Sequence, residues 1–203
     1  TPLDFYCRPD GTFQHTKLFE ADYNVRVDGP FVPIYVEDQN GVPIVNKTQD
    51  IHLKGEEYLT FEVQPFLRVE LDDTPMISDG VITARVKVDR GVSKDDFKKV
   101  VAQTGDYSDS YLNMTDIQLF VSYSSSCGYR ARDERWSNEI LYSGKAFETQ
   151  FGKTITITSN PKNPIPSGRK VFIRAAARIN YDTPAGSGTR RWNYSEVVEV
   201  DIP

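Results

Sequence analysis

The sequence predicts an all-β fold made of two antiparallel β domains, with one short helix. Apolar side chains recur at every second position in many segments, which is the period of a β-strand. Turn-forming pairs such as Asp28-Gly29 and Asn40-Gly41 separate these segments. Aromatic residues, which strands favour, make up 12% of the 203 residues. Many short strands between turns are typical of a sandwich or barrel.

Residues 59–71 show the clearest alternation, because every odd position from Leu59 to Leu71 is apolar. The even positions are mostly polar, with Phe66 as the exception, so one face should be buried and the other wet. Pro65 has no N–H to donate and marks an edge or a bend. Further strands of this period are predicted at residues 23–27, 82–88, 117–123, 155–157, 171–179 and 194–202.

One segment has the spacing of a helix. Ser93 is a suitable N-cap, and Asp96 follows three residues later in a weak capping box. Phe97, Val100 and Val101 then share one helical face, and Gly105 ends the segment. A single short helix in a connection is therefore expected.

A domain boundary is predicted within residues 72–79. Asp72-Asp73-Thr74-Pro75 follows the longest predicted strand, and Ser78-Asp79-Gly80 precedes the next one. Proline and polar residues at this spacing are typical of a linker. The predicted domains are residues 1–74 and 75–203.

The composition excludes several classes of function. A net charge of −5 without a basic cluster argues against a nucleic-acid partner. With His15 and His52 as the only histidines, and no G-x-S-x-G or phosphate-binding motif, we expect no enzyme and no cofactor. A glycosidase using two carboxylates stays open, but no pair stands out among 29 acidic residues.

The sequence also predicts no metal site. Asp106, Asp109 and Asp116 do not have the spacing of a calcium loop and are interpreted as solvated loop carboxylates. Cys7 and Cys127 are too few for a disulfide scaffold or a zinc site. One bridge between them would join opposite ends of the chain; the alternative is two buried free thiols.

The candidate ligand-binding residues are four aromatic residues in the predicted second domain, near a group of arginines. They are Tyr129, Trp136, Tyr181 and Trp192, with Tyr142 nearby, and the arginines are Arg130, Arg132, Arg135, Arg190 and Arg191. Aromatic faces stack on the apolar faces of sugars, and arginine donates to hydroxyls. The alternative is that both tryptophans pack in the core with arginines stacked on them.

Several stretches resemble a Bacteroidetes two-domain surface lipoprotein family of unknown function, encoded near Sus-type glycan-uptake systems. Residues 4–6, 10–19 (DGTFQHTKLF) and 22–25 resemble its first domain, and residues 59–69 resemble the strand that ends that domain. Residues 171–178 and 192–198 resemble its C-terminal domain.

The resemblance implies a transthyretin-like (carboxypeptidase-regulatory-like) domain, N-terminally truncated here, followed by an Ig/fibronectin-III-like sandwich. It also implies export and a lipid anchor at the outer membrane, although Cys7 lies too deep in the motif to be the acylated residue. No functional residues carry over from this family.

The expected function is therefore that of a non-enzymatic cell-surface lipoprotein accessory to glycan binding or uptake. Its expected partners are a glycan or outer-membrane uptake proteins. The alternative is a structural or adhesive protein-interaction module that binds no sugar. The sequence leaves the oligomeric state open.

Overall fold

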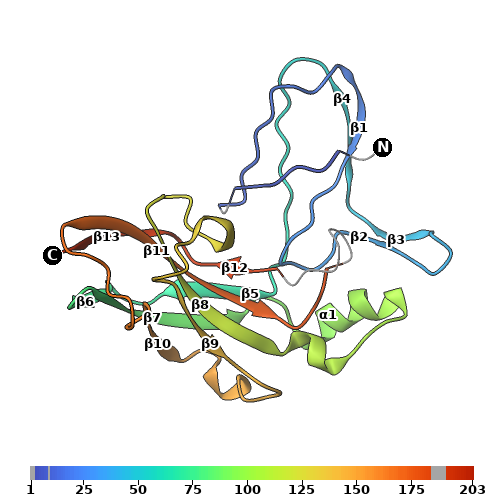
Figure 1. The fold of residues 1–203 in the computed structure, drawn as a ribbon. Helices are drawn as coiled ribbons and strands as arrows, with labels where there is room; N and C mark the ends of the chain where they lie inside the picture. Colours follow the sequence, from blue (N-terminus) through green and yellow to red (C-terminus); the bar gives the residue numbers. More distant parts are fainter. Residues whose placement is uncertain (1–2, 9, 184–190) are drawn as a thin grey trace.

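Antiparallel β-sheets dominate the computed structural model, which describes residues 3–8, 10–183 and 191–203 (Figure 1). The predicted all-β class with one short helix is confirmed. The elements in chain order are β1 (Ala21–Val25), β2 (Tyr35–Glu37), β3 (Pro43–Asn46), β4 (Gln49–Leu53), β5 (Leu67–Leu71), β6 (Met76–Ser78), β7 (Val81–Arg90), α1 (Lys94–Val101), η1 (Ala102–Thr104), η2 (Asp109–Leu112), β8 (Met114–Ser122), η3 (Tyr129–Ala131), β9 (Asn138–Leu141), η4 (Glu148–Gln150), β10 (Thr154–Thr158), β11 (Arg169–Ile179), β12 (Asn193–Tyr194) and β13 (Val198–Ile202).

Two sheets form a sandwich around one core. The four-stranded sheet has the order β10-β7-β5, with β6 also paired to β7. The five-stranded sheet has the order β12-β11-β8-β9, with β13 also paired to β11. Alternate residues of both sheets enter the same hydrophobic core, as the period-two patterns of β7, β8 and β11 predict.

The helix begins and ends where the sequence predicts. The hydroxyl of Ser93 accepts from the backbone N–H of Asp96, and a 3-10 turn follows α1 and ends at Gly105 with φ 81°. Phe97 and Val101 are buried in the core of the sandwich, whereas Val100 is half-buried. The apolar face of the helix therefore covers the sandwich. Within the described part of the chain, no helix has the length and apolar character to span a membrane.

The residues before the sandwich form a thin extension, here called the N-terminal arm (residues 3–64). Its sheets are two-stranded, β1 with β4 and β2 with β3, and it stands away from the sandwich in Figure 1. Ile34 and Val36 are its only buried hydrophobic residues among those described. The arm therefore has almost no core of its own, and its assignment as transthyretin-like stays a prediction.

The predicted strand over residues 59–71 is only half right. Residues 59–64 form no strand, and both Leu59 and Val63 are exposed. Pro65 makes an isolated bridge to Phe31, and regular pairing begins only at Leu67, which lies opposite Arg90 of β7. Alternation made the segment suitable for a strand, but only its second half meets a partner strand.

The predicted linker over residues 72–79 lies within a sheet. β5 pairs with the second half of β7 and β6 with the first half, so residues 72–75 interrupt one sheet edge. The N–H of Asp72 still donates to the carbonyl of Arg85 at 2.8 Å. The strand pairing therefore places the change from arm to sandwich before Phe66 rather than after residue 74.

Candidate functional site

The outer face of the five-stranded sheet carries a second, smaller group of buried residues. Phe120 of β8 and Ala176 of β11 pack there with Cys127 and Trp192, and we call these four residues the outer cluster. β8 and β11 are largely buried on both faces, so other segments cover their outer faces as well. The β8–β9 loop (residues 123–137) supplies Cys127, and the segment before β12 supplies Trp192.

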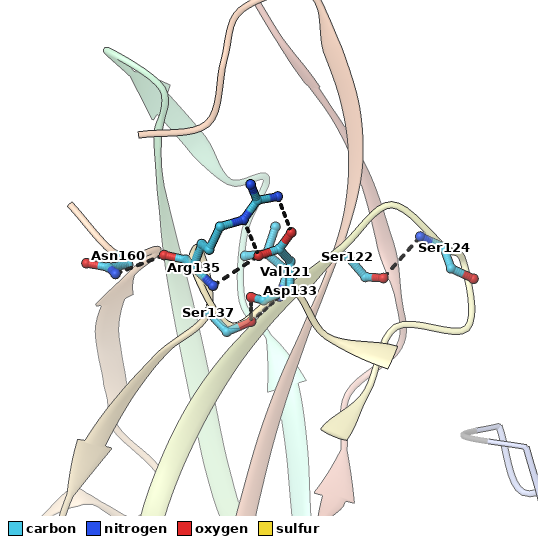
Figure 2. Close-up of polar contacts among 7 residues, drawn as sticks. All are labelled: Val121, Ser122, Ser124, Asp133, Arg135, Ser137 and Asn160. Atoms are coloured by element: carbon cyan, nitrogen blue, oxygen red, sulfur yellow. Dashed lines mark hydrogen bonds and ion pairs between the residues drawn. The ribbon is translucent and has the colours of Figure 1, made fainter. Parts of the chain in front are cut away.

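Hydrogen bonds hold the β8–β9 loop against the end of β8 (Figure 2). The N–H of Asp133 donates to the carbonyl of Val121 at 2.7 Å. The hydroxyl of Ser137 accepts from the N–H of Val121 at 3.0 Å and donates to the carbonyl of Asp133 at 2.8 Å. Asn160, which follows β10 in the chain, also holds the loop, because its Nδ2 donates to the carbonyl of Arg135 at 2.8 Å.

The Asp133 carboxylate binds Arg135 within the same loop. It accepts from the backbone N–H, Nε and Nη2 of Arg135 at 3.0, 3.0 and 2.7 Å. These hydrogen bonds, led by those from the Arg135 side chain, lower the pKa of Asp133. The loop is therefore a fixed platform for the side chains that it carries.

Trp136 and Tyr181, two of the four predicted binding residues, lie inside the main core. Trp136 packs edge-on against Tyr123 with a centroid distance of 5.0 Å. Tyr181 packs edge-on against Phe66 and Phe97 at 5.8 and 5.2 Å, and burial raises its pKa to about 12. The structure therefore does not gather the four aromatic residues on one surface.

Tyr129 and Trp192 do lie together. Their rings stack at 6.3 Å with an interplanar angle of 25°, and Phe120 meets Trp192 edge-on at 5.7 Å. Trp192 is only 7% exposed, whereas Tyr129 is 47% exposed. The guanidinium carbon of Arg132 lies 4.3 Å from the centroid of the Tyr129 ring. A ligand-binding role stays a prediction for this pair, in which Tyr129 presents the accessible surface.

Arg178 and Asp116 lie next to the Tyr129–Trp192 pair on the same face of the sheet, and we call these four residues the row. The guanidinium carbon of Arg178 lies 4.1 Å from the centroid of the Trp192 ring, and its Nε donates to Asp116 Oδ1 at 2.8 Å. Asp116 also accepts from the Thr115 hydroxyl at 2.6 Å and from Gln118 Nε2 at 3.2 Å. The prediction that Asp116 is a solvated loop carboxylate is wrong, because it lies in β8 and is 1% exposed.

An open depression lies at the end of this row. Six residues line it: Thr115, Asp116, Leu141, Tyr142, Ser143 and Arg178. Leu141 is 69% exposed and gives the depression an apolar wall, while Arg178 and Asp116 give it a paired charge. No pattern in the sequence predicts this depression, because Asp116 and Arg178 meet only through the pairing of β8 with β11.

Both cysteines are free thiols in the structure, so the alternative of a bridge is not realised. Cys127 is buried in the outer cluster, donates weakly to the carbonyl of Phe120 at 3.5 Å, and has a pKa raised to about 12 by burial. Cys7 is exposed, contrary to the expectation that both would be buried.

A second depression lies between β1 and β4 of the arm. Asp22, Tyr23, Asn24, Asp50, Ile51 and His52 line it. His52 Nδ1 lies 2.7 Å from Asp22 Oδ1, and both side chains are well exposed. No group of His, Cys, Asp and Glu side chains in the described ranges is arranged to hold a metal ion. Arg190, one of the arginines singled out from the sequence, lies outside these ranges.

The chain resembles several solved structures. A DUF3823 family protein from Bacteroides uniformis ATCC 8492 is 57% identical, with a TM-score of 0.93 over 98% of this chain and 81% of that chain. A DUF3823 family protein from Parabacteroides merdae ATCC 43184 is 13% identical, with a TM-score of 0.53 over 91% and 72% of the two chains.

A third solved structure, described as a candidate carbohydrate binding protein from Bacteroides uniformis ATCC 8492, is 17% identical. Its TM-score is 0.61 over 95% of this chain and 79% of that chain. At this identity the likeness concerns the fold alone. No protein-family model and no curated protein matches the chain.

Proposed function

Because the chain belongs to the DUF3823 family, whose function is unknown, we propose that it is a non-enzymatic cell-surface lipoprotein that assists glycan binding or uptake. One observation carries the proposal. On the outer face of the five-stranded sheet, the half-exposed ring of Tyr129 stacks on the buried Trp192, and Arg178, which also lies on Trp192, lines an open depression. Sites for polar ligands combine such aromatic surfaces with a few fixed hydrogen-bonding groups.

The openness of the surface fits weak, shape-based binding without chemistry. A distant neighbour in fold is described as a candidate carbohydrate binding protein, which makes glycans the first ligands to test. Cys127, the thiol nearest the row, is buried and burial raises its pKa to about 12, so it is not an activated nucleophile.

Export and a lipid anchor at the outer membrane are further parts of the proposal. They rest on the resemblance of residues 10–19 to a lipoprotein family encoded near Sus-type uptake systems. Outer-membrane uptake proteins are then the proposed partners. Cell fractionation with palmitate labelling tests this part, and an unlabelled protein found only in the cytoplasm would contradict it.

Binding is tested by isothermal titration calorimetry against a panel of oligosaccharides. We expect weak binding to at least one glycan and a loss of that binding in Tyr129→Ala. Tyr123→Ala is the matched control, because Tyr123 lies in the same loop, is equally exposed and packs against Trp136 instead. Binding of no glycan, together with normal glycan uptake after gene deletion, would contradict the proposal. Hydrolysis of a chromogenic sugar would contradict its non-enzymatic part.

A second candidate function is that of an adhesive or structural module without sugar binding. It is favoured by the exposed apolar side chains of the arm, among which Phe19 and Tyr58 are the most accessible. Such a module should associate with a protein through the arm. Sedimentation that shows concentration-dependent association, abolished in a Phe19→Ser, Tyr58→Ser variant, would favour this function.

A further inference from the structure

Arg178 is held in place while part of its hydrogen-bonding capacity stays unused. Its Nε is bonded to Asp116, and its guanidinium lies over the ring of Trp192. Within the described ranges, its two Nη groups donate no hydrogen bond, although the residue lines the open depression and its side chain is 25% exposed. A guanidinium fixed by stacking and by one ion pair loses little conformational freedom when it binds a ligand.

The charge of Arg178 is already compensated. Asp116 Oδ1 lies 2.8 Å from its Nε, so the six residues that line the depression carry one positive and one negative charge. A second carboxylate, that of Glu139, lies beside this pair and accepts from Gln118 Nε2 at 2.8 Å. An acidic ligand would therefore meet no net positive charge, whereas a hydroxyl oxygen could accept from the free Nη groups.

The wall opposite the charged pair is apolar. Leu141 ends β9 with its side chain largely in solvent, and the half-buried Tyr142 follows it. Sugar rings have this mixed character, since hydroxyl groups point outward from the ring and C–H groups form apolar faces. The depression thus offers donors for hydroxyls on one side and apolar surface on the other.

The row also bears on the length of the ligand. Arg178 lies on Trp192, and Tyr129 stacks on Trp192 with its own exposed surface beyond it. Trp192 thus contacts both Arg178 and Tyr129, so a ligand of two or more sugar units could lie in the depression and on the Tyr129 ring at once.

We infer that the depression at Arg178 and Leu141 is a subsite for an uncharged sugar unit, and that the surface selects neutral oligosaccharides of at least two units over acidic ones. This inference rests on the proposed glycan-binding function. It names the class of glycan and the residues that select it.

The test compares neutral and acidic probes on the whole chain by calorimetry. The neutral probes are gluco-, manno-, xylo- and galacto-oligosaccharides of four to six units, and the acidic probes are oligogalacturonate and sulfated oligosaccharides of the same length. We expect binding to a neutral probe and at least roughly tenfold weaker binding to every acidic probe.

Two variants locate the subsite. Leu141→Ser should weaken neutral binding roughly tenfold, the scale of a lost apolar contact in a binding pocket. Arg178→Lys keeps the charge beside Asp116 but removes the planar donor fork, and should weaken it similarly. Met76→Ser is the matched control, because Met76 is equally exposed but lies on the other sheet. Circular dichroism verifies that each variant is folded.

Leu141→Lys best distinguishes neutral from acidic selection, because it adds a positive charge at an exposed position of the depression. We expect it to lose neutral binding and to gain binding of oligogalacturonate. Tighter binding of an acidic probe by the unmodified chain overturns the inference. So does neutral binding that Tyr129→Ala abolishes but the Leu141 and Arg178 variants leave unchanged; glycan binding itself then stands. Binding of no probe overturns the inference, and together with normal glycan uptake after gene deletion it contradicts the proposed function as well.

Discussion

Tyr129 and Tyr181 both stand in polar stretches of the sequence, yet they meet opposite environments in the fold. Tyr129 is carried outward on the β8–β9 loop, whereas Tyr181 enters the core between Phe66 and Phe97. Sequence shows that both are aromatic residues close to a turn, but not which side of the sheet the turn places them on. This is why only one of the four predicted binding residues, Tyr129, has about half of its surface exposed.

Trp136 should matter for stability rather than for binding. Because it is buried in the main core, Trp136→Ala should lower the free energy of unfolding by about 3–5 kcal/mol. Tyr129→Ala should lower it by less than about 1 kcal/mol, since that ring is half in solvent. Urea unfolding measures both values. Equal losses in the two variants would contradict the placement of the rings.

The two thiols should differ in reactivity. Cys127 is buried with its pKa raised to about 12, so it stays protonated at pH 8, while Cys7 is exposed. A thiol reagent should therefore modify one cysteine in the folded chain and two in urea. Cys7→Ser should abolish the reaction of the folded chain, and rapid labelling of that variant would contradict the buried position of Cys127.

At the scale of elements, alternation predicted most strands of the sandwich well. β7, β8 and β11 match the predicted segments because their inner faces meet a common core. The same pattern wrongly predicted a strand at residues 59–64, which have no neighbouring strand to pair with. The spacing of apolar residues shows which secondary structure a segment can form. Which strand it pairs with is determined by contacts between residues far apart in the chain.

The turn between β6 and β7 should tolerate little change. Asp79 and Gly80 both have positive φ, 50° and 74°, and a Cβ on Gly80 would lie 2.4 Å from the carbonyl oxygen of Ile165. Gly80→Ala should therefore cost about 2 kcal/mol of stability. Asp79→Asn is the control and should change little, since Asn accepts positive φ. Thermal unfolding distinguishes the two.

The pH dependence of the β8–β9 loop follows from Asp133. Its pKa is lower in the folded chain, so its contribution to stability is complete above its unfolded pKa, about 3.9, and disappears as the pH falls through the folded value. Asp133→Asn should cost about 1 kcal/mol at pH 6 and less near pH 3. Urea midpoints at the two pH values measure this. The neighbouring Glu134→Gln, at an exposed ion pair, should show no such trend.

For the whole molecule, the sequence predicted the all-β class, whereas the residues chosen as a domain boundary lie within a sheet. The polar residues after Leu71 have the composition of a linker, yet the N–H of Asp72 still donates to β7 and β6 rejoins the same strand. The candidate site could be predicted less well than the fold. The Asp116–Arg178 pair and its depression exist only because β8 and β11 align in one register.

The pairing of β5 decides where the chain can be shortened. A version that begins at residue 75 lacks β5, leaves the second half of β7 unpaired on the edge that β5 occupies, and removes the strand beside Val86 and Val88. Unpaired apolar edges recruit other chains, so we expect this version to accumulate as insoluble material. A version that begins at residue 64 retains every strand of the sandwich and should stay in the supernatant after centrifugation. If both versions partition alike, β5 is dispensable for solubility.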